Sequence, residues 1–192
     1  MTQHIVQRGN NRCAVFGNTS DYQLFLGLLQ RESLRYAVAI HAYALMTTHF
    51  HLMATPTDTT GLSAMMQGIG RTYVPVFNFK HQRTGGLWEG RYRSFMIEDE
   101  TYWLTCLRYV ELNPVRAGMA ATSETYPWSS ARAHVCGDED PLLATHDVYL
   151  HLGATPDDRQ QAWRVICQAG MQESELAAMR EAIQKGRWGQ TP

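Results

Sequence analysis

The most restrictive feature of this sequence is the order in which strand-like and helix-like segments follow one another. Short apolar or alternating segments predict strands, and apolar residues that recur every three or four positions predict helices. Leu24, Phe25 and Leu28, for example, follow the helical period. The predicted strands are Ile5–Arg8, Val38–Leu45, His49–Thr55 and Arg93–Ile97, and the predicted helices among them are Tyr22–Tyr36 and Leu62–His81.

This order favours an α+β fold class. The succession β-α-β-β-α-β is that of the split βαβ, or ferredoxin-like, arrangement with an antiparallel sheet. A further helix over about residues 100–112 follows the fourth strand, and Asn113-Pro114 should end it. Pro75 should kink or split the second helix, because proline cannot donate a backbone hydrogen bond.

A smaller part is expected to follow this core. We assign residues 1–135 to the main domain and residues 136–192 to an irregular and helical C-terminal appendage. Two helices are predicted there, at about residues 157–169 and 172–185. We interpret these acidic helices as a packed lid or an oligomer contact rather than as a catalytic element.

The composition argues against several other classes of protein. The cysteines are scattered and form no Cys-x-x-Cys pair, which disfavours a zinc ribbon and a disulfide framework. The polar start of the chain does not resemble a signal peptide. No apolar run approaches the ~18–20 residues of a membrane span. We therefore expect a soluble, cytoplasmic protein that does not enter a membrane.

Charge is distributed unevenly along the chain, although the formal net charge is only −1. Residues 1–97 carry a balance of +5 and residues 98–192 a balance of −6. Residues 71–93 interleave cations with aromatic rings: Arg71, Lys80, Arg83, Arg91 and Arg93 with Tyr73, Phe77, Phe79, Trp88 and Tyr92. Such a segment suits single-stranded nucleic acid, whose phosphates attract cations and whose bases stack on rings. A solvated basic helix with its rings in the core is an equally good interpretation.

A pair of histidines on the third predicted strand, His49 and His51, is the first candidate site. Residues two apart on a strand point to the same face, and they lie about 6–7 Å apart along it. Phe50 should point the other way, into the core. Two parallel imidazoles provide half of a divalent-metal site.

A second candidate lies at the end of the helix over residues 100–112. Tyr109 and Asn113 are four residues apart and therefore share a helical face. Each also has an ordinary explanation, since asparagine often ends helices and buried tyrosines are common in cores. The combination of both candidates with the basic and aromatic segment is much less expected by chance.

These features together resemble a known family. His49-Phe50-His51 resembles the His-hydrophobic-His (HUH) motif of single-strand DNA transposases and nucleases, and the surrounding sequence resembles the REP-associated tyrosine transposases, relatives of the single-tyrosine insertion-sequence transposases. The resemblance extends from about His4 to Gly153. The segments that carry it are residues 4–12 (HIVQRGNNR), 86–92 (GLWEGRY), 108–118 (RYVELNPVRAG) and 126–130 (YPWSS).

The resemblance implies a metal-dependent mechanism. His49, His51 and Asn113 would bind Mg²⁺ or Mn²⁺, and Tyr109 would attack the scissile phosphate. The expected product is a 5′-phosphotyrosyl enzyme with a free 3′-OH. Because that linkage retains the phosphodiester energy, rejoining would need no nucleotide cofactor.

The resemblance also implies a DNA partner, a hairpin from a repeated extragenic palindrome with single-stranded DNA beside it. Candidate phosphate contacts are Arg8, Arg12, Arg71, Arg83, Arg91 and Arg93. Trp88 and Tyr92 are candidate platforms for base stacking, although Trp88 also suits the core. Both a monomer and a homodimer are compatible with the resemblance.

Two alternatives stay open at this point. One is a domesticated DNA-binding regulator that keeps the basic face and has lost catalysis. The other is a zinc hydrolase, in which His41 would be the third ligand beside His49 and His51.

Overall fold

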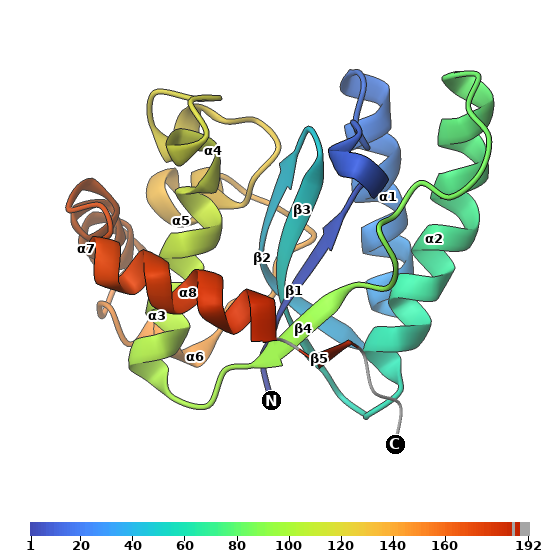
Figure 1. Ribbon diagram of the computed structural model, residues 1–192. Helices are drawn as coiled ribbons and strands as arrows, with labels where there is room; N and C mark the ends of the chain where they lie inside the picture. Colours follow the sequence, from blue (N-terminus) through green and yellow to red (C-terminus); the bar gives the residue numbers. More distant parts are fainter. Residues whose placement is uncertain (186, 189–192) are drawn as a thin grey trace.

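The computed structural model describes residues 1–185 and 187–188 of the chain. Its centre is an antiparallel sheet in the order β2-β3-β1-β4-β5, with helices on both faces (Figure 1). The strands are β1 (Gln3–Arg8), β2 (Val38–Met46), β3 (His49–Pro56), β4 (Arg93–Met96) and β5 (Arg187–Trp188).

The first four strands and their two connecting helices confirm the predicted ferredoxin-like arrangement. Strand β1 lies between β3 and β4, so the crossing connections are the two helices α1 and α2. The fifth strand was not predicted, because two residues are too few to produce a strand pattern. It pairs with Arg93 and Ser94 of β4.

Helices α1 (Thr19–Arg35) and α2 (Gly61–Lys80) cover one face of the sheet (Figure 1). The core beneath them includes Phe25, Phe50 and Tyr73, all buried. Helix α2 continues through Pro75, so the split considered from the sequence does not occur. Pro75 lies on the exposed side of α2, where water can satisfy the carbonyl that a proline leaves unpaired.

The other face of the sheet is covered by α3 and the C-terminal helices. These elements are α3 (Glu100–Glu111), α4 (Asn113–Arg116), α5 (Ala131–Cys136), α6 (Asp147–Leu150), α7 (Pro156–Gln168) and α8 (Glu173–Lys185), with 3₁₀ turns at Asn10–Arg12 and Ser123–Thr125. The two predicted C-terminal helices agree with α7 and α8 to within about a residue. The short α4, α5 and α6 have too few residues to show a helical period, and the sequence did not predict them.

A buried carboxylate ties α3 to the helices that follow it. Glu111 accepts hydrogen bonds from Ser130 Oγ at 2.7 Å and from Trp163 Nε1 at 2.8 Å. Its Oε1 also lies 2.6 Å from His134 Nδ1. Trp163 comes from α7, so the C-terminal part supplies one of the hydrogen bonds of this buried carboxylate.

Within residues 1–185 and 187–188, no helix is both long and apolar enough to cross a membrane.

Candidate active site

The alternation of β3 positions the histidine pair. His49 and His51 both face α3, and their ring centroids are 5.1 Å apart at an interplanar angle of 80°. Phe50 points to the opposite face, where its ring contacts Phe25.

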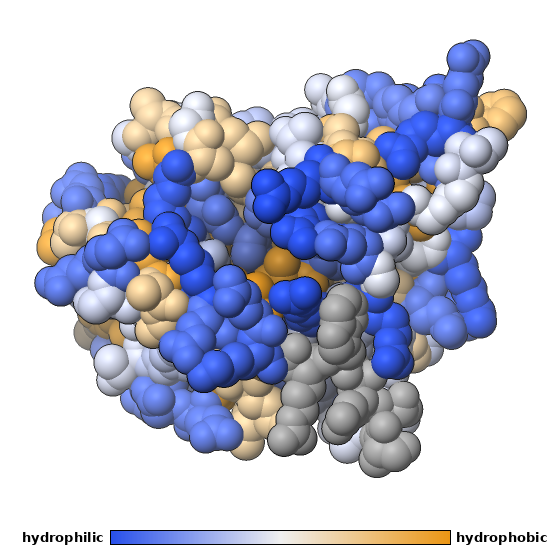
Figure 2. Space-filling view, in the orientation of Figure 1, coloured by the Kyte–Doolittle hydropathy of each residue, from blue (hydrophilic) through white to orange (hydrophobic). Residues whose placement is uncertain are grey.

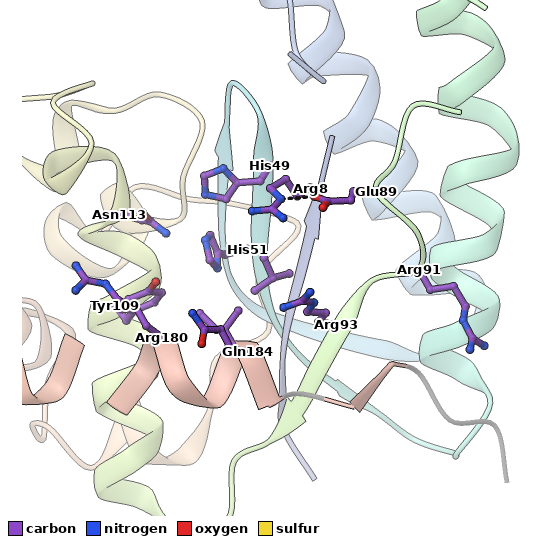
Figure 3. Close-up of a pocket in the computed structure, with 12 residues that line it drawn as sticks. Arg8, His49, His51, Glu89, Arg91, Arg93, Tyr109, Asn113, Arg180 and Gln184 are labelled. Atoms are coloured by element: carbon purple, nitrogen blue, oxygen red, sulfur yellow. Dashed lines mark hydrogen bonds and ion pairs between the residues drawn. The ribbon is translucent and has the colours of Figure 1, made fainter. Parts of the chain in front are cut away.

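Helix α3 brings Tyr109 to the same place. The Tyr109 ring centroid lies 5.7 Å from that of His51. Asn113, the first residue of α4, lies one turn beyond Tyr109. The four side chains lie around one hollow (Figure 3), a cavity of about 300 Å³ that all of them line. The structure therefore brings together Tyr109, Asn113 and both histidines.

Strands β1 and β4 add cations to this pocket. Arg8 of β1 is paired with His49 in the register, and Arg93 of β4 is paired with Val6, so both belong to the face that carries the histidines. Arg8 forms an ion pair with Glu89. Arg91 also lines the cavity, but its side chain extends away from the histidines (Figure 3).

The other three predicted DNA contacts do not line this pocket. Arg12 and Arg71 are exposed, in the first 3₁₀ turn and on α2, and Arg83 follows α2. Of the predicted stacking residues, Trp88 packs against the core, with its ring 5.7 Å from Phe50. Tyr92 is also partly buried against this core.

Three residues of the pocket come from α8, namely Arg180, Ile183 and Gln184. Figure 1 shows α8 passing in front of the sheet beside α3. The surface in Figure 2 is hollowed near its centre, with mostly hydrophilic residues around the hollow. The sequence did not predict this contribution, because more than sixty residues separate α8 from Tyr109 and no local pattern relates them.

Arg116 of α4 contacts the tyrosine directly. Its guanidinium carbon lies 4.3 Å from the centroid of the Tyr109 ring. Its Nη2 donates a hydrogen bond of 2.8 Å to the Tyr109 carbonyl oxygen. The cation is thus held against the face of the ring, a favourable arrangement for a π system.

Burial keeps the two histidines in their neutral form. Burial, together with the nearby Arg8 charge, lowers the pKa of His49 to about 4. Burial likewise lowers the pKa of His51 well below its ordinary range, and the positive charges that His49, His4 and Arg116 can carry act in the same direction. Neutral imidazoles have the lone pair that a metal ligand requires.

The position of His41 rules out its role as a third zinc ligand. Its Nδ1 lies 2.8 Å from the carbonyl oxygen of Ala144, and its Nε2 lies 2.8 Å from Thr55 Oγ1. Both ring nitrogens therefore have protein partners, and His41 does not line the pocket. Across the described part of the chain, no three His, Cys, Asp or Glu side chains form a group that could hold a metal. The structure therefore does not place His41 where the zinc interpretation requires it.

The sequence itself matches one known family. A sequence profile of the family described as "Transposase IS200 like" matches residues 1–113. The chain therefore belongs to the family of IS200-like transposases.

The fold is also similar to that of a solved transposase structure. One similar structure is a REP-associated tyrosine transposase bound to a REP hairpin; it is 17% identical, with a TM-score of 0.56, over 77% of this chain and 86% of that one. A transposase candidate from Deinococcus radiodurans is 14% identical with a TM-score of 0.44, over 62% and 90% of the two chains. No curated protein sequence matches this chain significantly.

Proposed function

We propose that this protein is a metal-dependent transposase that cleaves and rejoins single-stranded DNA at hairpin sites. The observation that carries the proposal is the placement of a tyrosine, two neutral histidines and an asparagine around one open pocket. A tyrosine phenol can act as a covalent nucleophile, and cations beside it can hold a phosphate.

The donor atoms of the pocket fit a divalent cation. His49, His51 and Asn113 would supply two imidazole nitrogens, which are softer ligands than Mg²⁺ usually prefers, and one amide oxygen of the kind that suits Mg²⁺ and Mn²⁺. When bound there, such an ion would polarise the phosphate and offset the charge that grows on its oxygens.

In the proposed reaction the Tyr109 oxygen attacks phosphorus. A bond forms between that oxygen and phosphorus while the bond from phosphorus to the 3′ oxygen breaks. The phenol proton leaves to solvent, and the departing 3′ oxygen takes up a proton. The products are a 5′-phosphotyrosine and a free 3′-OH. Because one phosphodiester replaces another, the reverse step rejoins the DNA without a nucleotide cofactor.

Hairpin DNA is the proposed partner, supported by the family and by the hairpin that the similar transposase binds. Arg8 and Arg93 would hold the phosphates that enter the pocket. Arg12, Arg71, Arg83 and Arg91 lie farther out and would contact the flanking DNA backbone.

The proposal is tested by covalent trapping. Hairpin DNA labelled at its 5′ or its 3′ end is incubated with the protein and Mn²⁺ or Mg²⁺, and adducts are separated on a denaturing gel. We expect an adduct that retains the DNA 3′ of the cut, and none after chelation. Tyr109→Phe should form no adduct, because it removes only the attacking oxygen.

Tyr102→Phe is the matched control, since Tyr102 lies on the same helix and does not line the pocket. It should react like the wild type. An adduct that persists in Tyr109→Phe would refute the assignment of the nucleophile. Salt-sensitive hairpin binding by a wild type that forms no adduct would favour the domesticated DNA-binding regulator instead.

A further inference from the structure

A third histidine lies directly behind the pocket. His4 of β1 is fully buried and does not line the cavity. Its Nε2 lies 2.9 Å from Nδ1 of His51, a hydrogen bond between two ring nitrogens. The register pairs Val6 with His51, so His4, two residues earlier, faces the same side of the sheet.

This hydrogen bond contains one hydrogen, which either ring can carry. If Nδ1 of His51 carries it, Nε2 of His51 has a free lone pair and can bind a cation. If Nε2 of His4 carries it, a neutral His51 must hold its own hydrogen on Nε2, and that nitrogen cannot then be a ligand. The choice of tautomer in the pair therefore decides whether His51 can bind a metal.

Two aromatic rings also lie against His4. Its ring centroid lies 4.9 Å from that of Phe95 and 6.0 Å from that of Tyr109. Its Nδ1 is buried, and no hydrogen-bond partner for it exists among the described residues. An apolar side chain would fill this position without leaving a nitrogen unpaired. What histidine adds here is the hydrogen bond to His51.

We propose that His4 is a positioning residue that accepts the Nδ1 hydrogen of His51 and thereby presents the bare Nε2 of His51 to the pocket. The inference rests on the metal site of the proposed function and adds a role for a residue outside that site. Partners behind a ligating histidine orient its ring and fix its tautomer in many metal sites.

The tautomers can be observed directly by NMR. Long-range ¹H–¹⁵N correlation spectra of the histidine side chains are recorded without metal and with Mg²⁺. We expect His51 to carry its hydrogen on Nδ1 in the Mg²⁺-loaded wild type. A hydrogen on Nε2 of His51 in that sample would overturn the proposal.

Metal affinity gives a second readout that does not depend on DNA cleavage. Mn²⁺ binding is measured by EPR titration for the wild type, His4→Phe and His4→Gln. His4→Phe removes the acceptor and should weaken binding about 10–100-fold. His4→Gln keeps an acceptor oxygen at a similar reach, so it should recover most of the affinity. Met53→Leu is the control for packing, because buried Met53 is the register partner of His4.

The outcomes separate this inference from the proposed function. Wild-type affinity in a folded His4→Phe variant would overturn the role of His4 and leave the metal site intact. Equal losses in His4→Phe, His4→Gln and Met53→Leu would show a packing effect and also overturn it. A wild type that binds no Mn²⁺ would refute the proposed metal site, and with it this inference.

Discussion

At the scale of single residues, strand alternation and the spacing of one helical turn account for the two histidines, Tyr109 and Asn113 in the pocket. His49 and His51 share a face because they are two apart on β3, and Phe50 enters the core for the same reason. The contacts of the Tyr109 ring, in contrast, include a residue far from it in the sequence. His51 lies on one side of its ring, and the Arg116 guanidinium lies against the ring.

The stacked guanidinium leads to a prediction at this scale. Arg116→Ala should slow adduct formation about 2–30-fold, since cation–π contacts contribute about 0.5–2 kcal/mol. The variant also loses the hydrogen bond to the Tyr109 carbonyl oxygen. Single-turnover trapping with excess protein measures the rate. Arg132→Ala, which changes an exposed arginine outside the pocket, is the control. If Arg116→Ala forms the adduct as fast as the wild type, the guanidinium does not assist the reaction of Tyr109.

At the scale of elements, helix α3 has two different environments on its two sides. Tyr109 faces the pocket, while Glu111 is buried among groups from α5 and α7. A buried carboxylate needs all of its hydrogen bonds, because an unpaired oxygen cannot recover its hydration. Helix α7 therefore stabilises the helix that carries the tyrosine.

Substitutions of two buried tryptophans test whether the hydrogen bond from α7 stabilises the fold. Trp163 donates to Glu111, whereas Trp103, equally buried in the same cluster, has an Nε1 without a hydrogen-bond partner among the described residues. Trp163→Phe should lower the free energy of unfolding by about 1–3 kcal/mol more than Trp103→Phe does, because it leaves an oxygen of buried Glu111 without a donor. Urea denaturation measures both. Equal losses would mean that the hydrogen bond contributes nothing beyond packing.

At the scale of the whole molecule, several histidines are buried between the sheet and the helices on the α3 side. Burial lowers the pKa to about 3 for His4 and to about 4 for His41 and His49. The unfolded chain titrates these groups near pH 6.5. Between about pH 6.5 and 4, the unfolded state therefore binds more protons than the folded state, and acid favours unfolding.

We accordingly expect the metal-free protein to lose stability as the pH falls from about 7 to 5. Each histidine that is fully charged in the unfolded state and neutral in the folded state contributes a slope of up to about 1.4 kcal/mol per pH unit. Urea denaturation in EDTA at several pH values measures this slope. His41→Gln should reduce it by up to one such contribution. A stability that does not change over this range would contradict neutral burial of these histidines.

The sequence determined the longer helices and strands and the residues of local motifs, because helical and strand periods depend only on neighbouring residues. The ferredoxin-like order, the shared face of His49 and His51, and the spacing of Tyr109 and Asn113 follow from such periods. Only the tertiary structure decided which distant groups meet at the pocket. His4 reaches His51 through strand pairing, and Arg180 reaches the cavity through the packing of α8. These contacts join residues far apart in the chain, and burial in the assembled layers, rather than any local pattern, brings them together.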